Sequence, residues 1–163
     1  MQKITPFLWF DTKAEEAAHF YISVFKTGKI LNVSHYSEAG AKGSGMPEGL
    51  AMVVEFELEG QIFNAINGGP HFTFTPAVSF VVRCENQEEI DHYWNLLSEG
   101  GAEEAQQCGW LADKYGLSWQ IVPNALMELM SSGTPAQANK VMEAMLQMKK
   151  IDIKTLQKAY EQA

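Results

Sequence analysis

The chain has 163 residues and a mass of 18.2 kDa, the size of one ordinary domain. Twelve basic against twenty acidic side chains give a formal charge of −8, which disfavours a nucleic-acid partner because such proteins need a basic surface. No apolar run approaches the ~20 residues of a membrane-spanning helix. The first residues lack a signal-peptide pattern, so we expect a cytoplasmic protein with no membrane partner.

The charge is unevenly distributed along the chain. Residues 1–134 carry seven basic and seventeen acidic side chains, a balance of −10, whereas residues 135–163 carry five and three, a balance of +2. The basic tail could dock onto its own acidic body or onto that of a second copy. It could equally be a lysine-rich helix surface that faces water.

The first half of the chain shows the pattern of one strand, one helix and three further strands. The aromatic and β-branched stretch Ile4–Phe10 predicts a buried strand. Asp11 or Thr12 is placed to cap a helix that runs to Phe25. The glycine-rich segment 38–49 predicts a mobile loop. The remaining strands are expected at Lys29–Tyr36, Leu50–Glu59 and Gln61–Asn67, with Glu59-Gly60 as the tight turn between the last two.

The second half begins the same pattern again and then changes to helix. Pro76–Cys84 predicts a strand and Asn86–Ser98 an amphipathic helix that Gly100-Gly101 terminates. Short strands follow around Gln106–Leu111 and Leu117–Val122, and we expect at least one of them to be stubby. The tail is expected to form three helices: Asn124–Ser131, a second from Thr134-Pro135 to about Lys150, and a third capped by Asp152 that ends at Tyr160.

Two short stretches recur in the same order, which indicates an internal duplication. Residues 14–21 and 87–94 share the pattern x-Glu-Glu-apolar-x-His-aromatic-aromatic, and residues 60–66 parallel residues 116–122. Two matches in one order predict two copies of a strand–helix–three-strand unit.

Several stretches resemble one known family. They are Ile4–Asp11 with Ala14–Ala17, Asn67-Gly68-Gly69-Pro70, and Cys108–Gln120. They are similar to the PhnB-like group, labelled 3-demethylubiquinone-9 3-methyltransferase-like, of the vicinal oxygen chelate superfamily. That superfamily includes glyoxalase I, extradiol dioxygenases and bleomycin- and fosfomycin-resistance proteins. The resemblance implies an α+β fold of two βαβββ modules within residues 1–123, the first about 1–70 and the second about 76–123. Residues 124–163 would be a C-terminal helical extension of the same domain.

The resemblance also implies a pocket enclosed by the concave sheets of the two modules. Metal enzymes of the superfamily place His, Gln or Glu ligands there on the first and last strands of each module. Carried onto this chain, those positions fall at Thr5, Asn64, Ser79 and Gln120. None is a histidine or a carboxylate, and hydroxyls and carboxamides are weak neutral ligands. We therefore expect no metal and no cofactor at this site, although a divalent metal held by other ligands stays open.

Aromatic and charged side chains supply the other candidates for the pocket. Alternation places Phe7 and Trp9 on one face of the first strand, with Trp9 facing the pocket, and Trp110 is a further candidate wall. His71, after the Gly-Gly-Pro turn, is a candidate for the rim. Arg83, the only arginine, could hold a carboxylate or phosphate bidentately, or could point outward and pair with Glu55 or Glu57 on a neighbouring strand. Cys108 has no adjacent base and is expected to be a buried free thiol.

The sequence leaves three candidate functions. Aromatic and amide side chains without metal ligands favour a small-molecule-binding protein whose ligand and catalytic residues, if any, are unknown. The alternative is a divalent-metal isomerase, lyase or dioxygenase. A methyltransferase is disfavoured, because the chain has no glycine-rich turn between a strand and a helix. The methionine-rich helix at Thr134–Lys150 predicts a homodimer to which the C-terminal helices contribute.

Overall fold

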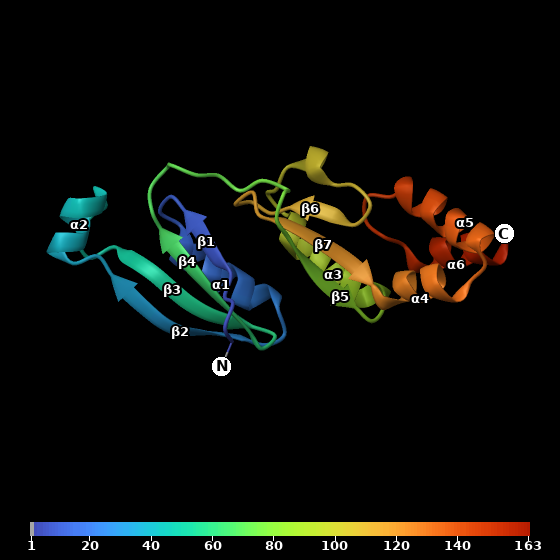
Figure 1. Cartoon of the computed structure of the whole chain (residues 1–163), viewed down its shortest axis with the longest axis horizontal. Coiled ribbons are helices and arrows are strands. Elements are labelled where there is room, and N and C mark those ends of the chain that lie inside the picture. Colours follow the sequence, from blue (N-terminus) through green and yellow to red (C-terminus); the bar gives the residue numbers. More distant parts are fainter. Residues whose placement is uncertain (1) are drawn as a thin grey trace. The chain divides into compact units, whose positions relative to one another are not determined.

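The computed structural model describes residues 2–163, and these divide into two units (Figure 1). The first unit ends at Thr73 and the second runs Phe74–Ala163. The boundary falls in the irregular segment between the two copies of the internal repeat.

The first unit is built on a four-stranded sheet in the order β1-β4-β3-β2. β1 runs parallel to β4, and the other neighbours are antiparallel. The turn between β3 and β4 is the expected Glu59-Gly60, and both residues have positive φ (48° and 80°), which suits the right-handed twist of a hairpin. The strands are β1 (Phe7–Phe10), β2 (Gly28–His35), β3 (Ala51–Leu58) and β4 (Gln61–Asn67).

Helix α1 (Ala14–Val24) packs on β3 and β4 and buries one face of this sheet. Small Ala17 and Ala18 let it approach closely, and Tyr21 stacks on Phe56 with ring centroids 6.3 Å apart. The expected cap at Asp11 or Thr12 is wrong. Lys13 occupies the N-cap without a side-chain cap bond, and the Ala14 N–H donates instead to Oδ1 of Asn67, 2.7 Å away at the end of β4.

The expected loop at residues 38–49 is also partly wrong, because α2 (Glu38–Ser44) forms there. Ser37 caps the helix by accepting a hydrogen bond from the Gly40 N–H at 3.2 Å. Gly45 ends it in the left-handed conformation, with φ at 75°. Two correct caps outweigh the low helix propensity of the glycines between them.

The second unit repeats this plan with one strand fewer. Its sheet has the order β5-β7-β6, and β5 runs parallel to β7 as β1 does to β4. After α3 (Gln87–Ser98), residues 99–109 hold only the short helix η1 (Glu103–Ala105), whereas residues 25–50 of the first unit hold β2 and α2. The shorter connection leaves no room for an eight-residue strand like β2. The strands are β5 (Ser79–Cys84), the stubby β6 (Trp110–Ala112) and β7 (Ser118–Pro123).

The tail folds into three helices with a small core of their own. α4 (Asn124–Ser132), α5 (Pro135–Leu146) and α6 (Ile153–Glu161) pack together, and α5 ends four residues before the expected Lys150. Thr134 caps α5 in a capping box with Gln137, and Asp152 caps α6, as expected. The buried members of the core are Leu126, Val141, Ile151 and Leu156.

The segment between α5 and α6 fastens the tail to the rest of its own unit. The N–H groups of Cys108 and Gly109 donate to the carbonyls of Met148 and Lys149, each at 2.8 Å. Gln87 on α3 donates to the Ile151 carbonyl at 3.1 Å and accepts from the Ile153 N–H at 2.9 Å. The Lys150 ammonium also lies 2.7 Å from the Asp91 carboxylate on α3.

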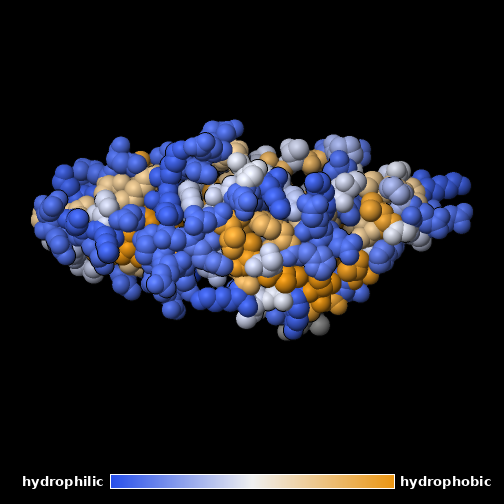
Figure 2. Space-filling model, turned by 180° about the vertical axis from the view of Figure 1, so that it is seen from behind, coloured by the Kyte–Doolittle hydropathy of each residue, from blue (hydrophilic) through white to orange (hydrophobic). Residues whose placement is uncertain are grey.

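None of the helices formed by residues 2–163 has the length and apolar character needed to cross a membrane. The surface in Figure 2 is largely hydrophilic, with apolar areas between the charged side chains. The large apolar side chains that stay exposed are Ile4, Phe7, Leu31, Phe72, Val78, Val81, Met127 and Leu146.

Candidate functional site

The face of the first sheet that points away from α1 is the first candidate surface, called here the first open face. Side chains alternate along β3 and β4, so that Val54, Phe56 and Phe63 are buried under the helix while their neighbours point the other way. The first open face carries Phe7, Trp9, Val53, Glu55, Glu57, Ile62, Asn64 and Ile66.

The strand register sets which of these side chains are neighbours. Phe7 pairs with Asn64, and Asn64 pairs with Glu55, so the three form one row across β1, β4 and β3. Trp9 begins the next row. The sequence did not suggest a binding role for Glu55. The apolar residues on both sides of it in β3 could have indicated that it faces away from the helix.

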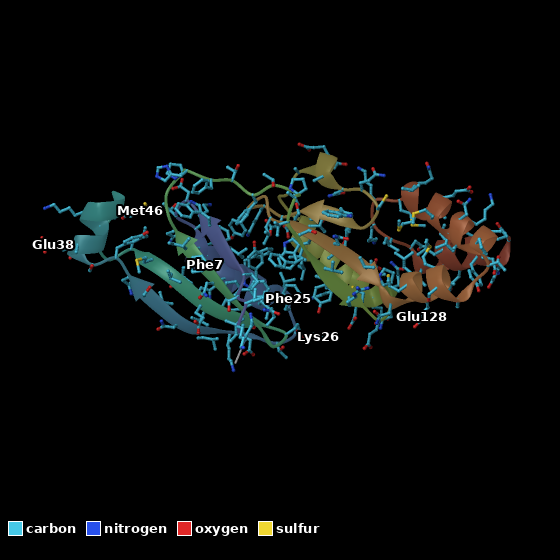
Figure 3. All side chains as sticks on the ribbon, in the orientation of Figure 1. Phe7, Phe25, Lys26, Glu38, Met46 and Glu128 are labelled. Carbon is cyan, nitrogen blue, oxygen red and sulfur yellow. The ribbon has the colours of Figure 1, made fainter. Side chains whose placement is uncertain are left out.

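The Trp9 ring is held firmly at the end of this face. Its Nε1–H donates to the Gly69 carbonyl at 2.9 Å, and a methyl group on Gly68 would overlap the indole. The rings of His71 and Phe72 stand edge-on to it, with centroids 6.4 and 4.9 Å away. Figure 3 shows Phe7 on β1 of the same unit and Met46 beyond the end of α2.

The motif Asn67-Gly68-Gly69-Pro70 therefore has a structural role in the first unit. Besides capping α1, the buried Asn67 side chain donates to the Ala51 carbonyl at 2.9 Å. The main-chain carbonyl of Asn67 accepts from the Tyr36 hydroxyl at 2.6 Å. Gly68 makes room for the Trp9 indole. Asn67 and Gly68 therefore help to position the side chains of the first open face.

The second sheet has an equivalent surface, the second open face, on the side away from α3. Gln120 occupies the place of Asn64, because it pairs with Val81 on β5 as Asn64 pairs with Phe7 on β1. Its Nε2–H donates to the Ser79 hydroxyl at 2.9 Å. The second open face carries Ser79, Val81, Arg83, Trp110, Ala112, Ser118, Gln120 and Val122.

An open pocket of about 400 Å³ lies at the β6 end of the second unit. That volume is within the range of small-molecule sites. Its lining is mainly apolar, with Gln107 and Ser118 as polar groups. Cys108, expected to be buried, is partly exposed there and has a positive φ of 52°. The lining residues are Pro76, Ala105, Gln107, Cys108, Trp110, Leu111 and Ser118.

The sequence candidates are distributed over both units. Phe7, Trp9 and Asn64 share the first open face with His71 at its edge, and Thr5 lies just before β1. Ser79, Arg83, Trp110 and Gln120 share the second. Arg83 is exposed, and its expected alternative partners are not on a neighbouring strand, because β5 pairs with β7 whereas Glu55 and Glu57 lie on β3 of the other sheet.

The motif around Asp113 is likewise structural. One carboxylate oxygen of Asp113 accepts from the N–H groups of Tyr115 (2.8 Å) and Leu117 (3.1 Å). The other oxygen accepts from Nε1 of the buried Trp119 at 2.9 Å. Asp113 thereby shapes the turn between β6 and β7, the strands that carry Trp110 and Gln120.

The side chains at the four superfamily ligand positions do not fit a catalytic metal. Thr5, Asn64, Ser79 and Gln120 offer neutral hydroxyls and carboxamides, and two of them are hydrogen-bonded to each other. Across residues 2–163, no group of three or more His, Cys, Asp or Glu side chains is placed to hold a metal ion.

The strand–helix turns do not fit S-adenosylmethionine either. Residues 11–13 and 85–86 connect each first strand to its helix, and neither turn contains a glycine. A glycine-rich turn is what lets the backbone approach such a cofactor in Rossmann-like sheets.

Two βα units with parallel first and last strands, helices on one face and open sheets on the other make up an α+β fold. The profile of the 3-demethylubiquinone-9 3-methyltransferase family matches residues 2–122, and the chain belongs to this PhnB-like family.

The chain is also similar to several solved structures. The chain is 42% identical to a putative 3-demethylubiquinone-9 3-methyltransferase, PhnB protein, from Bacillus cereus, with a TM-score of 0.64 over 75% of this chain and 99% of that one. Protein PA1353 from Pseudomonas aeruginosa shares the fold at 17% identity and a TM-score of 0.59, over 76% of this chain and 98% of that one. The fosfomycin resistance protein FosX from Listeria monocytogenes is 14% identical, with a TM-score of 0.49 over 78% and 97%. No curated protein matches the sequence.

Proposed function

We propose that this PhnB-like protein binds a small organic molecule on its open sheet faces and does so without the catalytic metal of its superfamily. The observation that carries the proposal is an apolar pocket of about 400 Å³ in the second unit. Its lining residues Ser118 and Trp110 pair in the sheet with Ser79 and Gln120, which are neutral and hydrogen-bonded to each other. Apolar walls with a few placed polar groups are the ordinary make-up of a small-molecule site.

The metal part of the proposal is tested by elemental analysis of the purified protein after growth in metal-supplemented medium. We expect far less than one Zn, Mn, Ni or Fe per chain. One bound metal per chain that protects the protein against thermal unfolding would overturn the proposal in favour of a metal-dependent isomerase, lyase or dioxygenase. Calorimetry with S-adenosylmethionine should show no binding, and binding would favour the methyltransferase.

The binding part is tested by a thermal-shift screen against metabolites, followed by variants of the pocket wall. Trp110→Ala should lower the affinity for any ligand that stabilises the second unit, because this half-buried ring lines the pocket. Met127→Ala, which removes an exposed side chain from α4, is the control and should bind normally. A screen without any hit would contradict the proposal. So would ligands that bind the Trp110→Ala variant as tightly as they bind the Met127→Ala control.

We also propose that the protein is a homodimer. The large apolar side chains of the tail are mostly accounted for inside their own unit, where Val141 and Leu156 are fully buried. The large apolar side chains of the tail that remain available for a dimer contact are Met127 and Leu146, each about half exposed (52% and 50%).

Light scattering tests the dimer, and point variants are better than truncation because the tail is part of the second unit. Met127→Glu with Leu146→Glu should lower the dimerisation affinity if the tail contributes. The same change at Leu31, an exposed position on β2, is the control. A monomeric wild type would refute the dimer, and a double variant that pairs as tightly as wild type would refute the role of the tail.

A further inference from the structure

The first open face carries a carboxylate, that of Glu55, which forms no ion pair with any described residue of its unit. Glu55 stands on the internal strand β3, between Asn32 on β2 and Asn64 on β4. Glu57, two residues further along, has the Lys29 ammonium opposite it at 4.0 Å. Within residues 2–163 the Glu55 carboxylate has no such ion pair and no hydrogen bond, although its side chain is only partly exposed. The charges of this face therefore favour a cation beside Glu55.

Aromatic rings stand on the same face with their surfaces partly open. Phe7, at the end of the row that contains Glu55, is 57% exposed, and Phe72, which packs edge-on against Trp9, is 66% exposed. The Trp9 indole is fixed by its hydrogen bond to Gly69. Rings that are already held in place bind a ligand at a low cost in side-chain entropy. They also attract cations through the negative face of the ring.

The spacing between the carboxylate and the rings sets the size of the ligand. Glu55 and Phe7 lie two strands apart in one row, so their backbones are separated by about 10 Å, twice the usual distance between neighbouring strands. Asn64 lies between them and offers a carboxamide that is not engaged in a hydrogen bond within residues 2–163. A ligand that touches both ends needs a charged head, a body of several carbon atoms and an apolar or aromatic end.

We propose that the first open face binds an organic cation, an ammonium or amidinium group beside Glu55 with an apolar body that lies over Asn64 against Phe7 and Trp9. This inference rests on the proposed small-molecule function and names the chemical class of the ligand. An organic anion is disfavoured because it would meet the Glu55 carboxylate, which has no cation opposite it within residues 2–163. A neutral apolar ligand would cover Glu55 and leave its charge without compensation.

The test uses three probes that share a phenyl ring and a four-carbon chain and carry a positive, a neutral or a negative head group: 4-phenylbutylamine, 4-phenylbutanol and 4-phenylbutyrate. Binding to the full chain is measured by NMR titration, with fluorotryptophan labelling to resolve the signal of Trp9. We expect the amine to bind about tenfold more tightly than the alcohol, because a charge pair of this kind at partial exposure contributes roughly that much. The acid should bind more weakly than the alcohol.

Two variants that make the same chemical change locate the charge effect. Glu55→Gln should bring the affinity for the amine down to that for the alcohol and leave the alcohol unchanged. Glu57→Gln should keep most of the preference for the amine over the alcohol, because the wild-type Glu57 carboxylate already faces Lys29. Phe7→Ala should weaken the amine and the alcohol by a similar factor.

The outcomes separate this inference from the proposed function. No binding of the amine, equal binding of the three probes, or an equal loss of preference in the two glutamine variants would overturn the assignment of a cation to Glu55. Those results would leave the small-molecule function standing as long as the metabolite screen yields a ligand. A screen without hits in the metal-free protein would remove the proposed function itself.

Discussion

Replacing Asn67 by alanine tests whether the residue that links β4 to α1 is structural. The Asn67 side chain is 1% exposed, accepts from the Ala14 N–H at 2.7 Å and donates to the Ala51 carbonyl at 2.9 Å. Loss of a helix cap costs about 1 kcal/mol, and a buried carbonyl left without a donor costs about 1–3 kcal/mol more. The free energy of unfolding should fall by roughly 2–4 kcal/mol, a large part of the ~5–15 kcal/mol of an ordinary domain.

The assay is urea unfolding, followed by circular dichroism and by fluorotryptophan NMR, which distinguishes Trp9 of the first unit from the other tryptophans. Asn64→Ala is the matched control. It removes the same side chain from the same strand, but on the open face, where no hydrogen bond within residues 2–163 is lost, and it should cost less than about 0.5 kcal/mol. Equal effects of the two substitutions, or a loss below about 1 kcal/mol for Asn67→Ala, would refute this account of the motif.

Three further substitutions should have distinct effects. Gly68→Ala should displace the Trp9 indole and destabilise the first unit by about 1–3 kcal/mol, because the added methyl group overlaps the ring. Asp113→Ala should lower the free energy of unfolding by several kcal/mol and shift the NMR signal of the Trp119 indole N–H, since three donors lose their acceptor. The pKa of Asp91 is lowered below its ordinary 3.8, first by its hydrogen bond to a lysine ammonium. The ion pair with Lys150 therefore stabilises tail docking above that pH. The protection factors of the α6 amides, which correct for the pH dependence of intrinsic exchange, should fall as the pH drops below 3.8, and less so in Asp91→Asn.

Each of these has a control or a contradicting result. Gly43→Ala adds a methyl group that meets no atom within 4 Å and should be close to neutral. Asp11→Ala removes an exposed carboxylate and should cost little. The pH effect should be small because Asp91 is 44% exposed and screened by water. An Asp91→Asn protein whose exchange in α6 responds to acid as strongly as wild type would rule out this ion pair as the cause.

The sequence alone predicted the elements whose signal is local. The expected strand Gln61–Asn67 is β4 to the residue, because alternating side chains and a Glu-Gly turn define it within one stretch of chain. Thr134 and Asp152 were identified as caps for the same reason, since a capping side chain bonds to backbone groups two or three residues away. The internal repeat alone places Asn64 and Gln120 at equivalent positions.

Contacts between distant residues could not be predicted in this way. The cap of α1 comes from Asn67, fifty-three residues away, because the fold brings the end of β4 to the start of the helix. Nothing near Asp11 signals this. From the sequence, the basic tail could dock onto its own body or a second copy, or could equally be a lysine-rich surface that faces water. The hydrogen bonds from Cys108 and Gly109 show that the segment between α5 and α6 is attached to its own unit.

The sequence by itself determined the order of the strands and of every longer helix, the duplication, the family and the neutral side chains at the four ligand positions, because periodicity and motif are properties of neighbouring residues. It missed the short helix α2. Only the tertiary structure decided which side chains share a surface. It placed Glu55 beside Asn64 and in one row with Phe7, residues that lie up to fifty-seven positions apart in the chain. Strand pairing across the sheet sets those neighbours, and the pairing depends on packing against α1 rather than on any local pattern.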